Sequence, residues 1–224
     1  GGKSVIEVIL KFNTKFGECE GVVRLYEDYE QQRTFKAWSF LTALSELNDS
    51  NNKKIEKYRN TLEGPNWLDN RKKDRLFNNR EPEVIVVGSG QAGLSIASRL
   101  KQQDIDTLIV DKNERVGDNW RNRYHSLKLH NQTHVNHLPY MPFPSTWPTY
   151  IPKDKLAGWF EYYAESMELN VWTNTKFVGA EYNENKNYWN VRLKLSDGMI
   201  KIVKPKHIVM AVGVSSVPNR IKLL

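Results

Sequence analysis

The apolar residues of this chain follow two different patterns. Up to about residue 45 they alternate with polar residues, as is typical of antiparallel strands with one buried face. This alternation predicts three strands, and a three-stranded sheet needs another element to cover its apolar face. No such cover is evident in the sequence. The predicted strands are residues 3–12, 21–30 and 32–44.

Uninterrupted apolar runs replace the alternation after residue 83. Val84–Val87 and Thr107–Val110 are such runs, as expected for parallel strands buried on both faces. Between them, the apolar residues of 91–102 recur at helical spacing, so the three segments predict a βαβ unit. A helix is expected over residues 153–168. Beyond it we predict a three-strand antiparallel meander at residues 176–182, 188–195 and 199–203, and a further buried strand at 207–211.

The segment between the two patterns is polar and rich in Asn and Lys. It contains the breaker pair Gly64-Pro65 and one charged stretch, residues 66–80, that predicts a short helix. We therefore predict a β-rich fragment of an α+β domain at residues 1–45, a linker at 46–82 and a dinucleotide-binding domain at 83–224. The predicted fold class is α/β, a doubly wound, Rossmann-like FAD/NAD(P)-binding domain with an antiparallel β-meander, preceded by the β-rich fragment.

Composition narrows the function classes. The 224 residues carry a net charge of +7 that is spread along the chain, which suits an anionic small ligand better than a nucleic acid. A hydrophobic content of 39% excludes a disordered chain, and no run of 18 apolar residues could span a membrane. Cys19 is the only cysteine, so a disulfide framework, a CxxC pair or a cysteine zinc site within this chain is excluded. No signal peptide is visible, which predicts a cytoplasmic location. The chain starts with Gly1 and enters a strand pattern almost at once, which predicts a fragment.

A glycine-rich turn follows the first buried strand. It reads G-x-G-x-x-G, in which the first glycine permits a tight turn, the second lets the backbone approach a pyrophosphate and the third lets the helix pack on the strand. The N–H groups of the following helix would face the anion. The predicted cofactor contacts are Gly88, Ser89, Gly90, Gln91, Ala92 and Gly93.

An acidic residue ends the second buried strand. Asp111 lies 18 residues beyond Gly93, near the spacing expected of a carboxylate that binds a ribose hydroxyl. Asp111 and the neighbouring Lys112 are predicted cofactor contacts. An acid here favours a ribose with a free 2′-hydroxyl, as in FAD or NAD, although Lys112 adds ambiguity.

The residues after Asp111 resemble flavin-containing monooxygenases, and in particular those related to the plant indole-pyruvate enzymes. Gly117 and Trp120 stand where that family has a Gly-Gly-x-Trp motif, with Asp118 in place of the second glycine. Further matching segments are Leu138-Pro139-Tyr140-Met141-Pro142-Phe143-Pro144, Trp147-Pro148 and Ile151-Pro152-Lys153. The resemblance covers residues 83–220. Residues 1–80 resemble, less specifically, the end of a SnoaL-like domain that precedes the flavin domain in microbial members.

The resemblance implies an activity and further site residues. FAD is reduced by NADPH, and one oxygen atom of O2 enters a small organic substrate. Gly117, Asn119 and Trp120 would contact FAD, and His130 and Asn131 would lie near the flavin ring, with His130 as the candidate catalytic residue. Gly213 would approach the flavin at the end of the last strand. There the family's Ala-Thr-Gly has Val212 in place of threonine.

Several alternatives stay open. Another flavin oxidoreductase with two dinucleotide sites, and a non-catalytic FAD-binding or interaction module, remain as functions; the sequence does not indicate a substrate or an oligomeric state. The spacing of His130, His134 and His137 invites a metal hypothesis, but no carboxylate or cysteine lies at ligand spacing nearby, and we predict no metal site.

Overall fold

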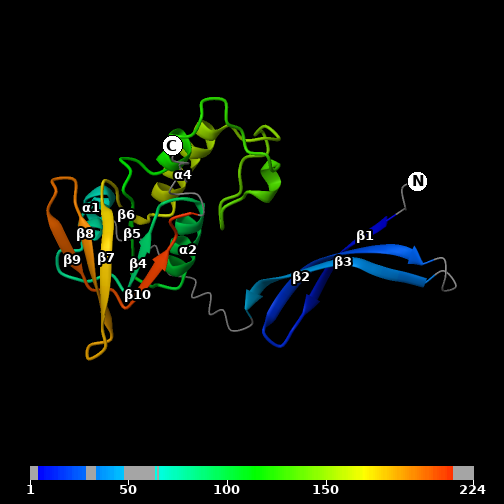
Figure 1. The fold of residues 1–224 in the computed structure, drawn as a ribbon, viewed down its shortest axis with the longest axis horizontal. Coiled ribbons are helices and arrows are strands. Elements are labelled where there is room, and N and C mark those ends of the chain that lie inside the picture. Colours follow the sequence, from blue (N-terminus) through cyan, green and yellow to red (C-terminus); the bar gives the residue numbers. More distant parts are fainter. Residues whose placement is uncertain (1–4, 29–33, 48–63, 65, 214–224) are drawn as a thin grey trace, which may run out of the picture. The chain divides into compact units, whose positions relative to one another are not determined.

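The structure, a computed structural model, describes residues 5–28, 34–47, 64 and 66–213. The chain divides into two compact units, Gly1–Asn52 and Lys53–Leu224. Each unit is described separately below, with the element labels of Figure 1. No helix among the described residues is both long enough and apolar enough to cross a membrane.

The first unit contains a three-stranded sheet. Strands β1 (Val5–Asn13), β2 (Gly17–Asp28) and β3 (Thr34–Leu47) pair antiparallel in the order β1-β2-β3, which confirms the three predicted strands. The register places apolar side chains of all three strands on one face. These side chains are Ile6, Val8, Leu10, Phe12, Cys19, Val23, Leu25, Phe40 and Leu44.

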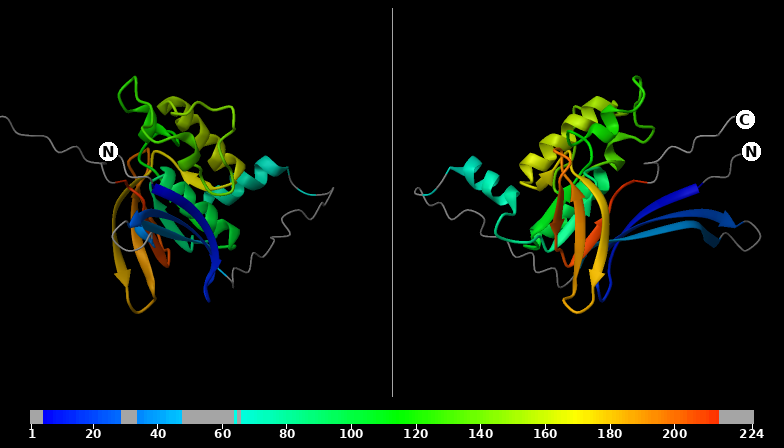
Figure 2. Two further views of the ribbon diagram at one scale, coloured as in Figure 1. Left: turned by 90° about the vertical axis from the view of Figure 1, so that its right-hand side faces the viewer. Right: turned by 60° about the vertical axis from the view of Figure 1, so that its left-hand side comes forward.

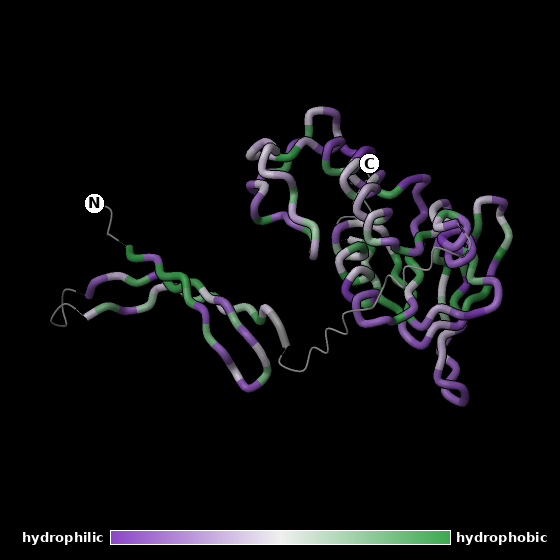
Figure 3. Tube along the Cα trace, turned by 180° about the vertical axis from the view of Figure 1, so that it is seen from behind, coloured by the Kyte–Doolittle hydropathy of each residue, from purple (hydrophilic) through white to green (hydrophobic). Residues whose placement is uncertain are grey.

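The predicted burial of that face is wrong for the described residues of this unit. Phe40 is 60% exposed, and Leu44 and Ile6 are 51% and 47% exposed, because no described helix of the unit lies over them. The hydropathy colouring of Figure 3 shows the apolar positions running along these strands. Alternation therefore predicted the strands correctly but could not supply the element that would cover them.

The second unit is built on a four-stranded parallel sheet. Its strands are β4 (Val84–Val87), β5 (Thr107–Val110), β6 (Asn170–Trp172) and β10 (His207–Met210), in the order β10-β4-β5-β6. Helix α2 (Gln91–Gln102) connects β4 to β5 and completes the predicted βαβ unit. Strand β10 returns to the other side of β4, so the direction in which strands are added reverses next to β4, a position where doubly wound folds bind ligands.

The parallel sheet is covered on both faces. Val86 and Ile109 point to a core shared with α2 and with α4 (Lys153–Ser166), while Ile85 and Leu108 point to the opposite core. That second core is closed by a meander sheet, which lies across the parallel sheet from α2 in Figure 2. Its strands are β7 (Lys176–Asn183), β8 (Tyr188–Lys194) and β9 (Ile200–Val203). The predicted fold class of this unit is confirmed.

A long connection between α3 (Asp118–Arg121) and α4 contains the proline-rich segment and the 3-10 turn η1 (Thr133–Val135). Phe143 is 5% exposed and stacks on Trp147 with ring centroids 4.8 Å apart, which supports a structural rather than a substrate-binding role for these aromatics. The Tyr163 hydroxyl of α4 donates to the carbonyl oxygen of Pro139 at 2.9 Å and anchors this connection. Burial raises the pKa of Tyr163.

Helix α1 (Trp67–Leu76) falls within the predicted linker, yet it belongs to the second unit and packs next to β6. Arg71 is 4% exposed and donates to the Leu169 carbonyl oxygen at 3.0 Å and to Asn170 Oδ1 at 3.1 Å. Burial, and to a lesser extent Arg75, lowers the pKa of Arg71.

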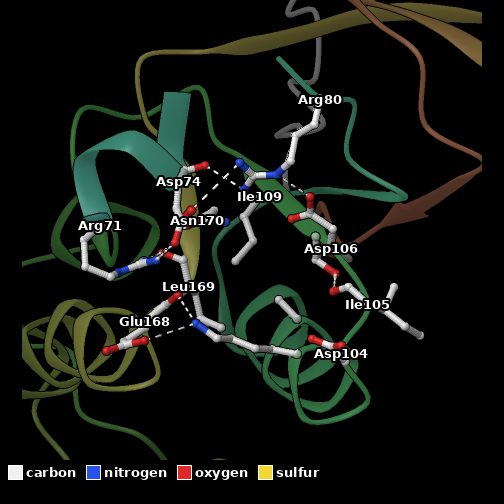
Figure 4. Close-up of a pocket in the computed structure, with 13 residues that line it drawn as sticks. Arg71, Asp74, Arg80, Asp104, Ile105, Asp106, Ile109, Glu168, Leu169 and Asn170 are labelled. Carbon is white, nitrogen blue, oxygen red and sulfur yellow. Dashed lines mark hydrogen bonds and ion pairs between the residues drawn. The ribbon is translucent and has the colours of Figure 1, made fainter. Parts of the chain in front are cut away.

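Below the helix lies a cavity of about 370 Å³, in which Arg80 bridges Asp74 and Asp106 (Figure 4). These ion pairs connect Asp74 of α1 through Arg80 to Asp106, the residue before β5, and so help to hold α1 in place.

Replacing Arg71 by Met tests this docking. The change leaves the Leu169 carbonyl and the Asn170 amide oxygen without their donor, and we expect the second unit to lose about 2 kcal/mol of stability. Urea denaturation measures the loss. The control is Lys72→Met on the exposed side of the same helix, for which we expect a change within about 0.5 kcal/mol. Equal effects of the two substitutions would contradict the docking role.

Candidate cofactor-binding site

A pocket of about 680 Å³ opens at the carboxyl edge of the parallel sheet. The segments that follow β4, β5 and β10 form it, together with the start of α2, helix α3 and the start of β7. The volume is in the range of small-molecule and cofactor sites. Of the predicted site residues, those that line it are Gly88, Gly90, Gln91, Ala92, Asp111, Lys112, Asn119, Trp120 and Gly213.

The glycine turn has the geometry that its spacing predicts. Gly88 has a φ of +107°, and a Cβ there would lie 2.5 Å from the carbonyl oxygen of Ala211, the residue that follows β10. A Cβ at Gly93 would lie 1.9 Å from the Gly88 carbonyl oxygen, so only glycine lets α2 pack this closely on the turn. Gly93 is therefore buried behind the pocket and does not line it.

Gly90 is different, because its backbone conformation (φ −77°, ψ −174°) is open to any residue. A Cβ there would meet only the side-chain nitrogen of Asn119 at 3.2 Å. Gly90 is also the N-cap of α2 and offers no side chain to the first N–H groups of the helix. The turn thus presents a bare backbone and free N–H donors to the pocket, a combination that binds phosphate groups.

Asp111 is joined to the glycine turn by hydrogen bonds. Its Oδ2 atom accepts from the backbone N–H and from the hydroxyl of Ser89, both at 2.7 Å, and its Oδ1 atom accepts from the Asn113 N–H at 2.9 Å. Ser89 is 1% exposed and does not line the pocket, so its place in the structure is to hold Asp111. Asp111 keeps free acceptor capacity toward the pocket because a carboxylate has about four lone-pair sites.

Asp111→Asn tests this arrangement. An amide has only one acceptor oxygen, so whichever way it turns, at least one of the three donors loses its partner. We expect a loss of about 2 kcal/mol in the thermal or urea stability of the second unit. Ser89→Ala removes one donor without leaving another unpaired and should cost about 1 kcal/mol. If Asp111→Asn were neutral, the carboxylate would not be organising the turn.

Helix α3 forms another wall of the pocket and explains the departure at Asp118. Gly117 has a φ of +92°, and a Cβ there would lie 2.5 Å from the Ala157 carbonyl oxygen of α4. Asp118 begins the helix, accepts from the Arg115 N–H at 3.0 Å and pairs with Arg121 at 2.9 Å. Its helical conformation does not require glycine, so the substitution stabilises α3 rather than disrupting it.

Three further predicted residues, Gly117, His130 and Asn131, lie outside the pocket lining, whereas Gly213 is part of it. Gly117 packs on α4 behind the pocket. His130 and Asn131 are both exposed and lie in the long connection before α4, outside the pocket lining. Gly213 lines the pocket at the end of the described residues with a φ of +80°.

Sequence reasoning missed several lining residues. Thr175, Lys176 and Phe177 come from the first residues of the meander, and Arg123 follows α3. The Thr175 N–H donates to the Asp111 carbonyl oxygen at 2.8 Å, which brings the meander to the site. The sequence gives little indication that Lys176 belongs to the site. The bond that brings it there joins Thr175 to Asp111, more than sixty residues away in the chain.

Two observations test whether a dinucleotide cofactor fits. The bare backbone at Gly90 leaves the space that any side chain would fill. Trp120 lines the pocket, and its indole Nε1 is buried without a hydrogen-bond partner among the described residues. Together with the Asp111 carboxylate, the cradle, acid and aromatic ring match the phosphate, ribose and flat ring of such a cofactor.

Comparisons with known proteins agree with this geometry. Residues 86–144 match the NAD(P)-binding Rossmann-like domain family. An uncharacterized CzcO-like oxidoreductase of Geobacillus kaustophilus is 40% identical over 102 residues, which cover 44% of this chain and 28% of that protein. The protein named "Probable indole-3-pyruvate monooxygenase YUCCA4" of Arabidopsis thaliana is 33% identical over 119 residues, covering 53% of this chain and 28% of its own length. The predicted resemblance to the relatives of indole-pyruvate monooxygenases is thereby confirmed.

Solved structures agree on the fold. The bacillithiol disulfide reductase Bdr (YpdA) of Bacillus cereus superposes with a TM-score of 0.60 at 18% identity, covering 64% of this chain and 43% of its own. The OTEMO complex with FAD and NADP superposes with a TM-score of 0.55 at 22% identity, covering 64% and 28%. The chain spans only 26% to 38% of the length of the curated relatives it matches.

Proposed function

We propose that the second unit is the FAD-binding part of an NADPH-dependent flavin monooxygenase. The full reaction would insert one oxygen atom of O2 into a small organic substrate. The observation that carries the proposal is the pocket at the carboxyl edge of the sheet, in which the bare Gly90 turn leads into α2 and is joined to Asp111 through Ser89. Sequence similarity to indole-3-pyruvate monooxygenases supports the reaction class.

The residues of the pocket have distinct roles in this proposal. Gly90 and the first N–H groups of α2 bind the pyrophosphate of FAD, and Asp111 accepts a hydrogen bond from the ribose of the adenosine. Trp120 packs against the cofactor and excludes water from that wall. FAD, when bound, supplies the redox chemistry and the reaction with O2, and the protein positions it.

Further residues, of which His130 and Asn131 lie outside the pocket lining, complete the proposal. His130 and Asn131 lie close to the flavin ring in the assembled enzyme, with His130 as the candidate catalytic residue, and Gly213 approaches the flavin. NADPH binds at a site distinct from this pocket, because the G-x-G-x-x-G turn of residues 88–93 is assigned to FAD. We propose residues 83–224 as the FAD-binding domain, residues 46–82 as a linker and residues 1–45 as strands of a SnoaL-like domain. The presence of a single cysteine fits a cytoplasmic location.

A flavin enzyme of the disulfide-reductase type is a weaker candidate, although one such reductase shares the fold. The residues of this chain offer no cysteine pair for that chemistry, since Cys19 is their only cysteine and lies in β2 of the first unit. The monooxygenase proposal requires no protein nucleophile and therefore agrees better with the residues present.

The proposal is tested by comparing the binding of FAD and FMN, which differ in the adenosine and pyrophosphate groups that the pocket is proposed to bind. FAD carries the adenosine ribose and pyrophosphate, and FMN lacks the adenosine. We expect FAD to bind at least about a hundredfold more tightly than FMN, as measured by quenching of flavin fluorescence. ADP should compete with FAD. Equal affinity for FMN and FAD, or no competition by ADP, would contradict the assignment of the pocket.

A further inference from the structure

Three cationic side chains surround the mouth of the cofactor pocket and are called the cationic rim. Lys112, Arg123 and Lys176 all line the pocket and are exposed. They come from three separate segments: the turn after β5, the residues after α3 and the start of β7. No ion pair joins any of them to an acidic residue within the described part of the chain.

The acidic groups of the pocket do not neutralise the cationic rim. Asp111 directs its carboxylate to Ser89 and to the Asn113 N–H. Asp118 directs its carboxylate to Arg121 and to the Arg115 N–H. The Asp118 carboxylate is therefore paired with Arg121, and the Asp111 carboxylate is bound by neutral donors of the pocket wall, so neither forms an ion pair with the exposed side chains of the cationic rim.

Two members of the cationic rim flank Asp111. Lys112 follows it directly in the chain, and Lys176 follows Thr175, whose N–H donates to the Asp111 carbonyl oxygen at 2.8 Å. Arg123 belongs to another wall, two residues beyond the end of α3. The positive field of the rim therefore spans the pocket mouth instead of marking one point on it.

We propose that the cationic rim captures the anionic pyrophosphate of the dinucleotide and accelerates its association, while the Gly90 cradle and Asp111 hold it once bound. This inference rests on the proposed function. Unpaired cations at the mouth of a low-dielectric cleft concentrate field lines and raise the association rate of an anion. Because the cations are exposed, they change the rate of association more than the rate of dissociation.

The experiment is stopped-flow binding of FAD to the full chain, followed by flavin fluorescence over a range of ionic strength. The rim variant is K112Q/R123Q/K176Q. The control K72Q/K73Q/K194Q removes the same net charge from exposed positions outside the pocket. At low ionic strength we expect the rim variant to associate about tenfold more slowly than wild type and the control to stay within about twofold.

Salt supplies a second readout. In about 1 M salt the Debye length is about 3 Å, and the association rates of all three proteins should converge. The dissociation rate should change by less than about twofold in the rim variant. A rim variant that associates at the wild-type rate, or a control that is slowed equally, overturns the proposal.

An alternative role of the same cations is to recognise a phosphate on the ribose. Competition by NADP⁺ distinguishes this role from capture of the pyrophosphate. Steering of the pyrophosphate predicts that NADP⁺ competes with FAD no better than NAD⁺. A strong preference for NADP⁺ that disappears in the rim variant would overturn steering in favour of ribose-phosphate recognition. Failure of the wild-type chain to bind FAD at all would refute the proposed function itself, a result distinct from unchanged association rates.

Discussion

Replacing Gly93 by Ala should destabilise the second unit by about 3 kcal/mol or more. The added Cβ would lie 1.9 Å from the carbonyl oxygen of Gly88, and that contact is between two backbone segments that no side-chain rotation can relieve. Helix α2 must move away from β4, which disturbs a core in which Leu94 and Ala97 are almost fully buried. Overpacking of this kind typically costs about 1–3 kcal/mol, and a backbone obstruction lies at the upper end.

Differential scanning calorimetry measures the effect on the transition of the second unit. For a unit of this size, 3 kcal/mol corresponds to a fall in Tm of about 6–12 °C. Gly158→Ala is the matched control, because Gly158 lies within α4 and a Cβ there would meet nothing within 4 Å. Alanine favours helix over glycine, so this control should raise stability by about 0.5–1 kcal/mol. The same sign for both substitutions would contradict the close packing at Gly93.

Replacing Gly90 by Val should weaken FAD binding more than a hundredfold while leaving the fold intact. The φ of −77° at Gly90 suits any residue, and only the exposed Asn119 side chain lies near the new Cβ. The two methyl groups would occupy the space that the backbone keeps open for the pyrophosphate. A hundredfold loss corresponds to about 2.7 kcal/mol of binding free energy.

The readouts are the FAD dissociation constant and the Tm without cofactor. Gln102→Val places the same side chain at the far end of α2, outside the pocket, and should not alter FAD affinity. Gly90→Val with wild-type affinity would exclude the turn as the phosphate cradle. A collapse of its Tm would instead assign Gly90 a structural role like that of Gly93.

The sequence predicted most of the elements that rest on a repeated pattern. Val84–Val87, Thr107–Val110 and the helix between them have the predicted bounds, because each consists of uninterrupted apolar residues or keeps a helical period over several turns. Strand β6 and helix α3 were missed, since three and four residues are too few to display a period. Their positions depend on long-range contacts, such as the bond from the Asp111 N–H to the Trp172 carbonyl oxygen.

In the candidate site, too, the residues within a local sequence pattern could be predicted, and those that depend on long-range contacts could not. The glycines and Asp111 could be predicted because they stand at a fixed spacing within one βαβ unit, which the sequence displays directly. Ser89 was predicted as a cofactor contact, whereas its hydroxyl is turned inward to Asp111, a bond that depends on the exact approach of two strands. Lys176 and Arg123 could not be found from spacing, because only the folded chain brings the meander and the end of α3 to the pocket.

We propose that the pocket at the carboxyl edge of the parallel sheet binds FAD. The most direct test is an absorption spectrum of the purified chain after incubation with FAD and removal of free flavin by desalting. We predict that the protein retains flavin bands with a stoichiometric amount of FAD, and that Gly90→Val, folded to the same extent, loses them. Wild-type protein that is folded by calorimetry yet emerges without flavin would contradict the claim.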